Sequence, residues 1–288
     1  MTFACLAPFA KVTPPRVKPP AEATDCHAHV IGVPPHYPFI PERAYTPPEA
    51  TVEAYQALHR DLGLERAVIV TPSVHGTDNR ITLEAIAAYG PGARGVAVVE
   101  EGIRERELHR LHDGGIRGLR LNVLFGGGVG LHAFEGLSDK IRDLGWHLQL
   151  WLDVSLHLEA MSSLIRQTNV PIVIDHMGFI PVEKGIDDPG FQLLLELVRD
   201  GICWVKLSGN YRIAQDHPRY ASAIPMAQAL IEAGPDRMVW GTDWPHVALK
   251  KNMVDDGDLL NALDDYAPSA DLKRAILVDN PARLYDFV

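Results

Sequence analysis

The chain has 288 residues, of which 47% are hydrophobic, and it carries a formal net charge of −10. This composition is enough to bury a large core and the length suits a single α/β barrel, so we exclude a disordered chain. The negative charge argues against nucleic acid or an anionic membrane as a partner, but a few arginines in a pocket can still attract a small anionic substrate.

The first 22 residues are proline-rich and are predicted to form an extended arm outside a barrel domain of residues 23–288. They lack the basic start and apolar stretch of a secretion signal. No apolar run in the chain approaches the roughly 20 residues that cross a bilayer. We expect residues 13–20 either to pack on a second subunit of a homodimer or to wrap the base of their own barrel.

Short apolar segments alternate with helical patterns along the rest of the chain. Eight segments are predicted strands: 24–30, 66–70, 94–99, 118–123, 147–153, 171–176, 203–209 and 238–243. The stretches between them, many of which end in glycine, are predicted helices: 48–63, 81–90, 105–115, 134–145, 155–168, 191–201 and 224–234. A last helix is predicted over 271–287.

Eight strands separated by seven helices, with a terminal helix, are what a closed (β/α)8 TIM barrel requires. A doubly wound open sheet also alternates, but it usually has fewer strands, and no G-x-G-x-x-G follows the first strand here. The glycine run Gly126–Gly130 follows the fourth strand without the Lys-Ser/Thr of a phosphate loop. It is either a flexible active-site loop or a plain connection.

Polar residues gather at the carboxyl ends of the predicted strands, where barrel enzymes place their chemistry. The first strand ends with His27 and His29, and alternation along the strand points both into the barrel mouth. The sixth strand ends with Asp175 and His176, and the eighth with Asp243. One inward histidine is more often an ordinary core residue, but three imidazoles and a carboxylate converging on one cavity indicate a site.

This pattern resembles the amidohydrolase superfamily. Longer strings sharpen the resemblance: ATDCHAHVIG, SVHGTDN, GIRGLRLN, PIVIDHMG, VWGTDWPH and DNPARLY. Together they are similar to the 2-pyrone-4,6-dicarboxylate lactonase family, over about Ala23 to Tyr285. The resemblance implies a hydrolase that opens a small carboxylated lactone, of the pyrone dicarboxylate or sugar-acid kind, in aromatic or sugar-acid catabolism.

The same four residues, His27, His29, His176 and Asp243, are the candidate ligands for one Zn²⁺ or Mn²⁺. A two-metal centre would need a bridging Lys or Glu and another histidine, which the fourth and fifth strands do not offer. The resemblance implies that even one metal is dispensable, because a lactone is an activated ester. We expect catalysis without a metal, with a single divalent ion as the alternative.

In the expected mechanism Asp243 is the general base that activates water. His27, His29 and His176 polarise the lactone carbonyl and stabilise the oxyanion. Asp243 then returns its proton to the leaving oxygen.

Further polar or aromatic residues near the strand ends are candidates for binding the substrate: Ser73, His75, Arg120, Trp151, Arg212 and His246. The arginines are favoured as carboxylate binders because a buried guanidinium without an anion is costly. Each candidate also has a structural interpretation: a turn for Ser73 and His75, ion pairs for the arginines, barrel packing for Trp151 and a loop cap for His246. For Lys206, on the seventh strand, the sequence leaves open whether it binds substrate or is a core residue instead.

The chain departs from the lactonase pattern at three positions. Gly126 stands where the family has a further arginine, Trp151 where it has a tyrosine, and Ala248 where it has an asparagine. The loss of one cationic donor suggests a substrate with fewer carboxylates or another ring.

Two alternative functions are also enzymatic, and a third is not. An isomerase that shifts the acyl group of a sugar-acid lactone would use the same acid and base groups, and a decarboxylase of the superfamily would need a bound metal. A non-catalytic binding barrel would not need Asp243 beside three histidines. The three widely spaced cysteines, none in a C-x-x-C pair, argue against a disulfide framework and suggest the cytoplasm.

Overall fold

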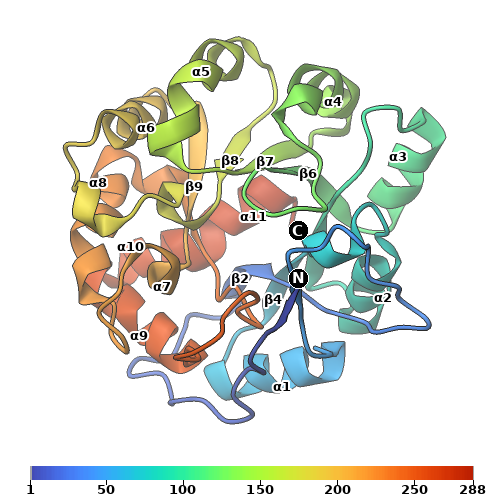
Figure 1. The fold of residues 1–288 in the computed structure, drawn as a ribbon. Helices are drawn as coiled ribbons and strands as arrows, with labels where there is room; N and C mark the ends of the chain where they lie inside the picture. The colour runs from blue at the N-terminus through green and yellow to red at the C-terminus, as the bar shows by residue number, and fades with distance from the viewer. Residues whose placement is uncertain (1, 288) are drawn as a thin grey trace.

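The computed structural model describes residues 2–287 (Figure 1). Its main sheet has eight parallel strands that lie side by side in the order in which they follow one another in the chain: β2 (Thr24–Ala28), β4 (Arg66–Val70), β5 (Ala93–Ala97), β6 (Ile116–Asn122), β7 (His147–Trp151), β8 (Ile172–Ile174), β9 (Cys203–Leu207) and β10 (Met238–Trp240). The ends of the sheet meet where Asp243 N donates to His27 O and His29 N donates to Trp244 O, both at 2.7 Å. The predicted (β/α)8 barrel is confirmed.

Helices surround the barrel in Figure 1. The predicted ones are present: α1 (Val52–Leu62), α2 (Arg80–Tyr89), α3 (Glu105–Asp113), α4 (Phe134–Ile141), α5 (Val154–Gln167), α6 (Pro189–Arg199) and α8 (Ile224–Ala233). Helix α1 starts later than predicted because the Thr51 side chain caps it by accepting from Ala54 N, and it ends at Gly63 in the left-handed conformation.

The structure differs from the predicted helices in three places. Helices α7 (Asn210–Ile213) and α9 (Asp256–Tyr266) were not predicted. Helix α9 was missed because its aspartates interrupt the pattern of apolar positions. It begins where the Asp255 carboxylate accepts from Gly257 N. The last predicted helix is instead α10 (Ala270–Arg274), a π-helical turn, and α11 (Asn280–Tyr285), whose Pro281 has no N–H to continue the ladder.

The barrel interior is apolar at its base and polar at its mouth. Inward side chains of the strands pack with α11 at the base: Cys26, Val68, Val70, Val96, Val173, Trp204, Val239, Leu284 and Tyr285. The register of β2 shifts between Asp25 and Ala28. Cys26 therefore packs in the base while the next residue, His27, already contacts the polar centre above it.

The N-terminal stretch packs against its own chain. Strand β1 (Phe3–Ala4) pairs in parallel with β3 (Tyr45–Thr46), in the loop after β2, and residues 5–23 contain no helix or strand. Thr13 N donates to the Asp255 carboxylate at 3.0 Å, and Arg16 N donates to Asn261 Oδ1 at 2.6 Å, so the stretch runs along α9. Within residues 2–287 no helix has the length and apolar character to cross a membrane.

Candidate active site

The four residues predicted at the strand ends lie together inside the barrel mouth. Asp243 Oδ1 lies 3.8 Å from His27 Nε2 and 3.7 Å from His29 Nε2, and Asp243 Oδ2 lies 3.8 Å from His176 Nε2. All four side chains are buried. Asp243 and His176 also have positive φ angles, 64° and 52°, which cost non-glycine residues free energy and cluster at functional sites.

The two oxygens of Asp243 have different surroundings. Oδ2 accepts from the Tyr211 hydroxyl at 2.7 Å and from Nε of Arg212, whereas Oδ1 has no hydrogen-bond partner among the described residues. Burial would raise the pKa of Asp243, but the Arg212 guanidinium holds it well below its ordinary value. Asp243 is therefore ionised at neutral pH, with one free oxygen facing the histidines.

The three histidines are held by different partners. His29 Nδ1 lies 2.8 Å from the Val70 carbonyl, which can only accept, so the proton of a neutral His29 is on Nδ1 and Nε2 carries a lone pair. His176 Nδ1 lies 2.9 Å from Ser208 Oγ, which can donate or accept. Burial lowers the pKa of both rings to about 4 and that of His27 well below its ordinary value, so all three are neutral at pH 7.

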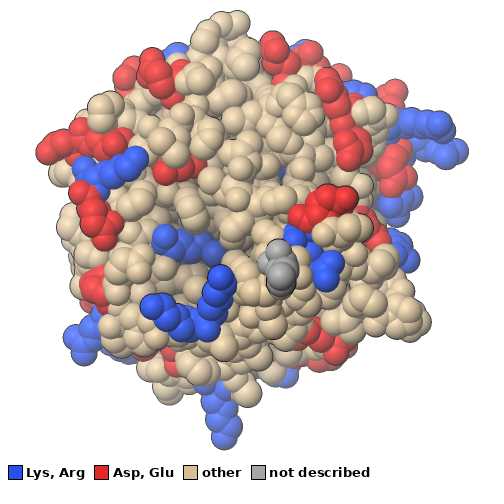
Figure 2. Space-filling model, in the orientation of Figure 1, with Lys and Arg blue, Asp and Glu red and all other residues tan. Residues whose placement is uncertain are grey.

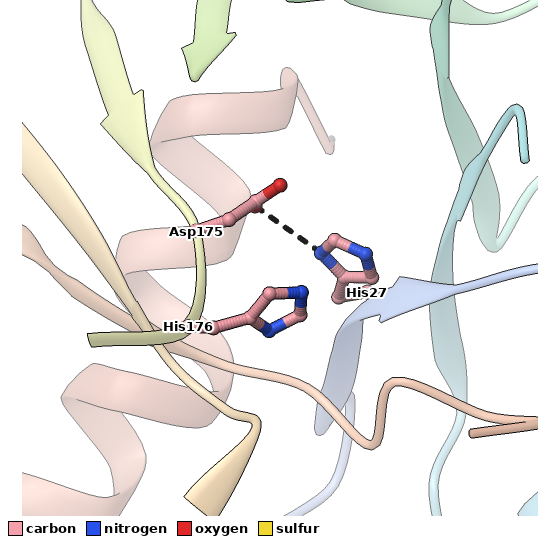
Figure 3. Close-up of side chains that lie close together, drawn as sticks. All are labelled: His27, Asp175 and His176. Atoms are coloured by element: carbon pink, nitrogen blue, oxygen red, sulfur yellow. Dashed lines mark ion pairs between the residues drawn. The ribbon is translucent and has the colours of Figure 1, made fainter. Parts of the chain in front are cut away.

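A second carboxylate, Asp175, completes the centre and was not among the predicted site residues. Figure 3 shows Asp175 and His176, from the end of β8, facing His27 on β2. Asp175 Oδ1 lies 3.3 Å from His27 Nδ1, and Oδ2 accepts from Gln149 Nε2 at 2.9 Å and from Arg120 at 3.2 Å. Burial would raise the pKa of Asp175, but the surrounding cationic side chains hold it well below its ordinary value.

The core residue Lys206 belongs to the same centre. Its Nζ lies 2.7 Å from Gln149 Oε1 and 3.2 Å from His27 Nδ1, with no solvent exposure. The sequence does contain a signal for Lys206: a lysine within the apolar run of β9 must find polar partners inside the barrel, because a buried ammonium needs them. Gln149 carries no comparable signal.

The predicted substrate-binding arginines flank one aromatic wall. The guanidinium of Arg120 lies 4.6 Å from the Trp151 ring centre and that of Arg212 lies 5.9 Å from it. Phe125 packs edge-on against Trp151 at 4.5 Å. Both arginines also make ion pairs, the structural role that the sequence left open: Arg120 with Asp175 and Arg212 with Asp243. Arg120 contacts Asp175 through Nε and Nη2, so its Nη1 group is left to bind a ligand.

The other predicted binding residues lie farther out. Ser73 Oγ is 3.4 Å from the Tyr45 hydroxyl, and the buried ring of His75 packs against Phe39, 5.5 Å between centres, rather than facing solvent. His246 lies behind Asp243, with Nδ1 3.2 Å from the Tyr211 hydroxyl and Nε2 3.1 Å from Asp256 Oδ1. Both ring nitrogens of His246 therefore face protein groups, although only Nδ1 makes a hydrogen bond among the described residues.

The donor set can hold one divalent ion. One ligand atom each of His27, His29 and Asp243 lies within 4.8 Å of the other two, and two buried atoms of this set, His27 Nε2 and Asp243 Oδ1, have no hydrogen-bond partner among residues 2–287. Imidazole nitrogen and carboxylate oxygen are the ligands that Zn²⁺ takes. The cationic side chains of Lys206, Arg120 and Arg212 add positive charge beside the same atoms.

Charge is unevenly distributed on the face shown in Figure 2. Acidic side chains lie mainly toward the rim, and the middle is largely uncharged, with several basic groups and one acidic patch close to it. The overall charge of −10 is therefore not concentrated in the middle of this face.

Known proteins are similar to this chain over nearly its whole length. A family model described as amidohydrolase matches residues 24–287. The chain is 38% identical to a 2-pyrone-4,6-dicarboxylate hydrolase of Comamonas testosteroni, covering 96% of this chain and 94% of that protein. It is 36% identical to a 4-sulfomuconolactone hydrolase of Hydrogenophaga intermedia (98% and 94% covered) and 29% identical to a D-galactarolactone isomerase of Agrobacterium fabrum (95% and 94%).

Solved structures share the fold. A crystal structure from Agrobacterium tumefaciens superposes with a TM-score of 0.86 at 27% identity, covering 95% of this chain and 99% of that one. A probable 2-pyrone-4,6-dicarboxylic acid hydrolase of Acinetobacter baumannii, with citric acid bound, gives a TM-score of 0.81 at 28% identity, covering 92% and 100%.

Proposed function

The chain belongs to the amidohydrolase family, and on that premise we propose that it is a lactone hydrolase, a carboxylic ester hydrolase that opens a small carboxylated lactone with water activated by Asp243. The observation that carries this proposal is the position of Asp243 Oδ1. This oxygen is buried and ionised, has no hydrogen-bond partner among the described residues, and faces Nε2 of His27 and of His29.

In the proposed reaction a water on Asp243 Oδ1 gives its proton to the carboxylate while its oxygen attacks the lactone carbonyl carbon. The carbonyl oxygen becomes the oxyanion of a tetrahedral intermediate. The ring C–O bond then breaks, the carbonyl re-forms, and Asp243 passes its proton to the leaving ring oxygen. The product is the open hydroxy acid, and the enzyme returns to its starting state.

The histidines take separate roles in this scheme. His29 does not take the carbonyl-polarising role expected from the sequence. Its Nδ1 donates to the Val70 carbonyl, so its Nε2 has a lone pair and is suited to hold the attacking water. His27 and His176 remain to donate to the carbonyl oxygen. Preorganised donors of this kind contribute about a hundredfold to a thousandfold in kcat each.

The substrate acid group is assigned to the two arginines beside Trp151. Arg120 and Arg212 are each nearly buried, and in each the Nη1 group makes no hydrogen bond or ion pair with another described residue. The names of the relatives, a pyrone dicarboxylate hydrolase and a sulfomuconolactone hydrolase, support an anionic lactone. Ser73 and His75 are proposed as outer contacts of the same substrate.

The metal-free reaction is the one we propose, with a single Zn²⁺ or Mn²⁺ as the alternative. If an ion binds, we propose that His27, His29 and Asp243 would hold it, with His176, 3.8 Å from Asp243 Oδ2, as the fourth ligand. The ion would supply Lewis acidity and lower the pKa of a bound water. The charges of Arg212 and Lys206 beside these ligands weigh against it.

A lactone isomerase is the second candidate, because a D-galactarolactone isomerase is 29% identical over 95% of the chain. Isomerisation would use the same acid and base groups but pass the acyl group to a second substrate hydroxyl. The product distinguishes the two: hydrolysis releases an acid, whereas isomerisation returns a lactone.

The cytoplasm is proposed as the location, supported by Cys5, Cys26 and Cys203, which are all free thiols in the structure. The homodimer is a prediction that light scattering of the purified protein tests.

The test of the proposed function is a pH-indicator assay on a panel of anionic lactones, with untreated and chelator-treated enzyme and elemental analysis of both. We expect turnover of a carboxylated lactone to an open acid, unchanged by the chelator. Activity that is lost with the metal and restored by Zn²⁺ or Mn²⁺ would replace the metal-free mechanism. Return of an isomeric lactone without acid would establish the isomerase.

A further inference from the structure

Lys206 is a buried charge that the proposed reaction does not use directly. It points into the barrel from β9, is 0% exposed, and lies among side chains of three other strand segments. Its Nζ lies 2.7 Å from Gln149 Oε1, 3.2 Å from His27 Nδ1 and 3.6 Å from Asp175 Oδ1. An ammonium has three N–H donors and no acceptor, and it donates to the first two of these atoms, while the contact with Asp175 Oδ1 is an ion pair.

The contact between Lys206 and His27 fixes the direction of a hydrogen bond. Because an ammonium can only donate, Nδ1 of His27 must accept, and the proton of the neutral ring is then on Nε2. The competing partner of Nδ1 is Asp175 Oδ1 at 3.3 Å. That oxygen is one of the buried atoms without a hydrogen bond in the described chain, so the geometry favours Lys206 as the partner.

We propose that Lys206 is a positioning residue that holds His27 in the Nε2–H tautomer, so that this ring presents a proton, and not a lone pair, to the reacting centre. His29 is held in the opposite tautomer by the Val70 carbonyl. One histidine of the His27-x-His29 pair is then a donor and the other an acceptor. In the proposed lactone hydrolysis, His27 then donates to the carbonyl oxygen and His29 holds the water. This role of the two tautomers rests on the proposed function.

The same contact has a consequence for metal binding. An imidazole that carries its proton on Nε2 has no lone pair there, so His27 cannot coordinate an ion through that atom without giving up the Lys206 hydrogen bond. Lys206 therefore lowers the metal affinity of a donor set that otherwise has suitable spacing. Removal of Lys206 would let Nδ1 of His27 donate to Asp175 instead, the arrangement that metal-bound histidines usually have with a carboxylate.

The direct test is ¹⁵N NMR of the wild-type protein labelled in its histidine rings, with His27→Gln used to assign the His27 signals. We expect a protonated Nε2 and an unprotonated, hydrogen-bonded Nδ1. A proton on Nδ1 of His27 in the wild-type protein would overturn the proposal. This readout needs neither substrate nor a folded variant at Lys206, so it stands apart from whether the protein turns over lactones.

The second test compares Lys206→Met with Lys140→Met, a surface control whose Nζ donates to the Ile103 carbonyl. We expect Lys206→Met to move the His27 proton to Nδ1 and, because Nε2 then has a free lone pair, to raise zinc affinity; groups that contact metal ligands alter metal affinity by about 10-fold to 100-fold. On any lactone that the wild type hydrolyses, kcat should fall about 100-fold with KM changed less than about threefold. A folded Lys206→Met with wild-type tautomer, zinc affinity and kcat would refute the positioning role, and Lys140→Met should change none of the three.

Discussion

Replacement of Asp25 tests whether its carboxylate joins the first and last strands beneath the candidate site. Asp25 is fully buried, and its oxygens accept from His27 N at 3.0 Å, Thr242 N at 2.9 Å, Thr242 Oγ1 at 2.6 Å and the Tyr55 hydroxyl at 2.9 Å. His27 and Thr242 lie on opposite sides of the barrel seam. The carboxylate therefore sets the distance between His27 and Asp243.

The expected cost follows from the groups that lose their acceptor. Asp25→Ala leaves two backbone N–H groups that cannot turn away, each costing about 1–3 kcal/mol when buried and unpaired, while the two hydroxyls can rotate. We expect the free energy of unfolding to fall by about 2–5 kcal/mol. Asp25→Asn keeps a carbonyl oxygen for both backbone donors, so its expected loss is about 1–2 kcal/mol.

The assay is urea unfolding followed by tryptophan fluorescence and circular dichroism at neutral pH, with kcat measured on the folded variants. Asp25→Ala should also lower kcat, because the spacing of His27 and Asp243 depends on the seam. An Asp25→Ala protein that unfolds within about 1 kcal/mol of the wild type, or Asn and Ala variants that lose the same free energy, would contradict this role of the Asp25 carboxylate.

Three further outcomes are expected. Burial lowers the pKa of His147 to about 3, so its contribution to stability is complete above the unfolded pKa of 6.5 and is lost as the pH falls toward 3. Between these two pH values, His147→Leu should flatten the pH dependence of the free energy of unfolding by up to about 1.4 kcal/mol per pH unit, measured by urea titrations at several pH values. Arg212 holds the pKa of Asp243 low, so Arg212→Gln should move the acid limb of the kcat/KM profile to higher pH, and an unmoved limb would contradict that electrostatic role. Trp151→Ala removes the wall beneath Arg120 and should destabilise the protein by about 3–5 kcal/mol and raise KM severalfold, whereas a KM equal to that of the wild type would place the substrate elsewhere.

The barrel and its catalytic end could be predicted because both depend on local patterns. Alternating apolar segments and glycine-ended helices gave the strand order, and strand-end residues in a closed barrel must converge. His27, His29, His176 and Asp243 could therefore be grouped before any distance was known.

The supporting residues could not be predicted in the same way, because their role depends on which strands face each other across the barrel. Lys206 and Gln149 are single polar residues in apolar strands, and only the closed barrel places them beneath His27. In the sequence Asp25 is only a neighbour of the His27-x-His29 motif. Its role depends on the closed barrel, in which Thr242 donates to its carboxylate. His246 was predicted at the mouth from its sequence position, but its ring is held between Tyr211 and Asp256.

The kcat of Asp243→Asn on a carboxylated lactone, compared with the wild type and with Lys140→Met, tests the central claim most directly. The variant keeps the size of the side chain and can still accept from Tyr211, so it is expected to fold with wild-type circular dichroism. We predict that kcat falls by at least about a thousandfold, because the amide cannot take the proton of the attacking water. A folded Asp243→Asn protein that retains kcat within about tenfold of the wild type would contradict the role of Asp243 as the base.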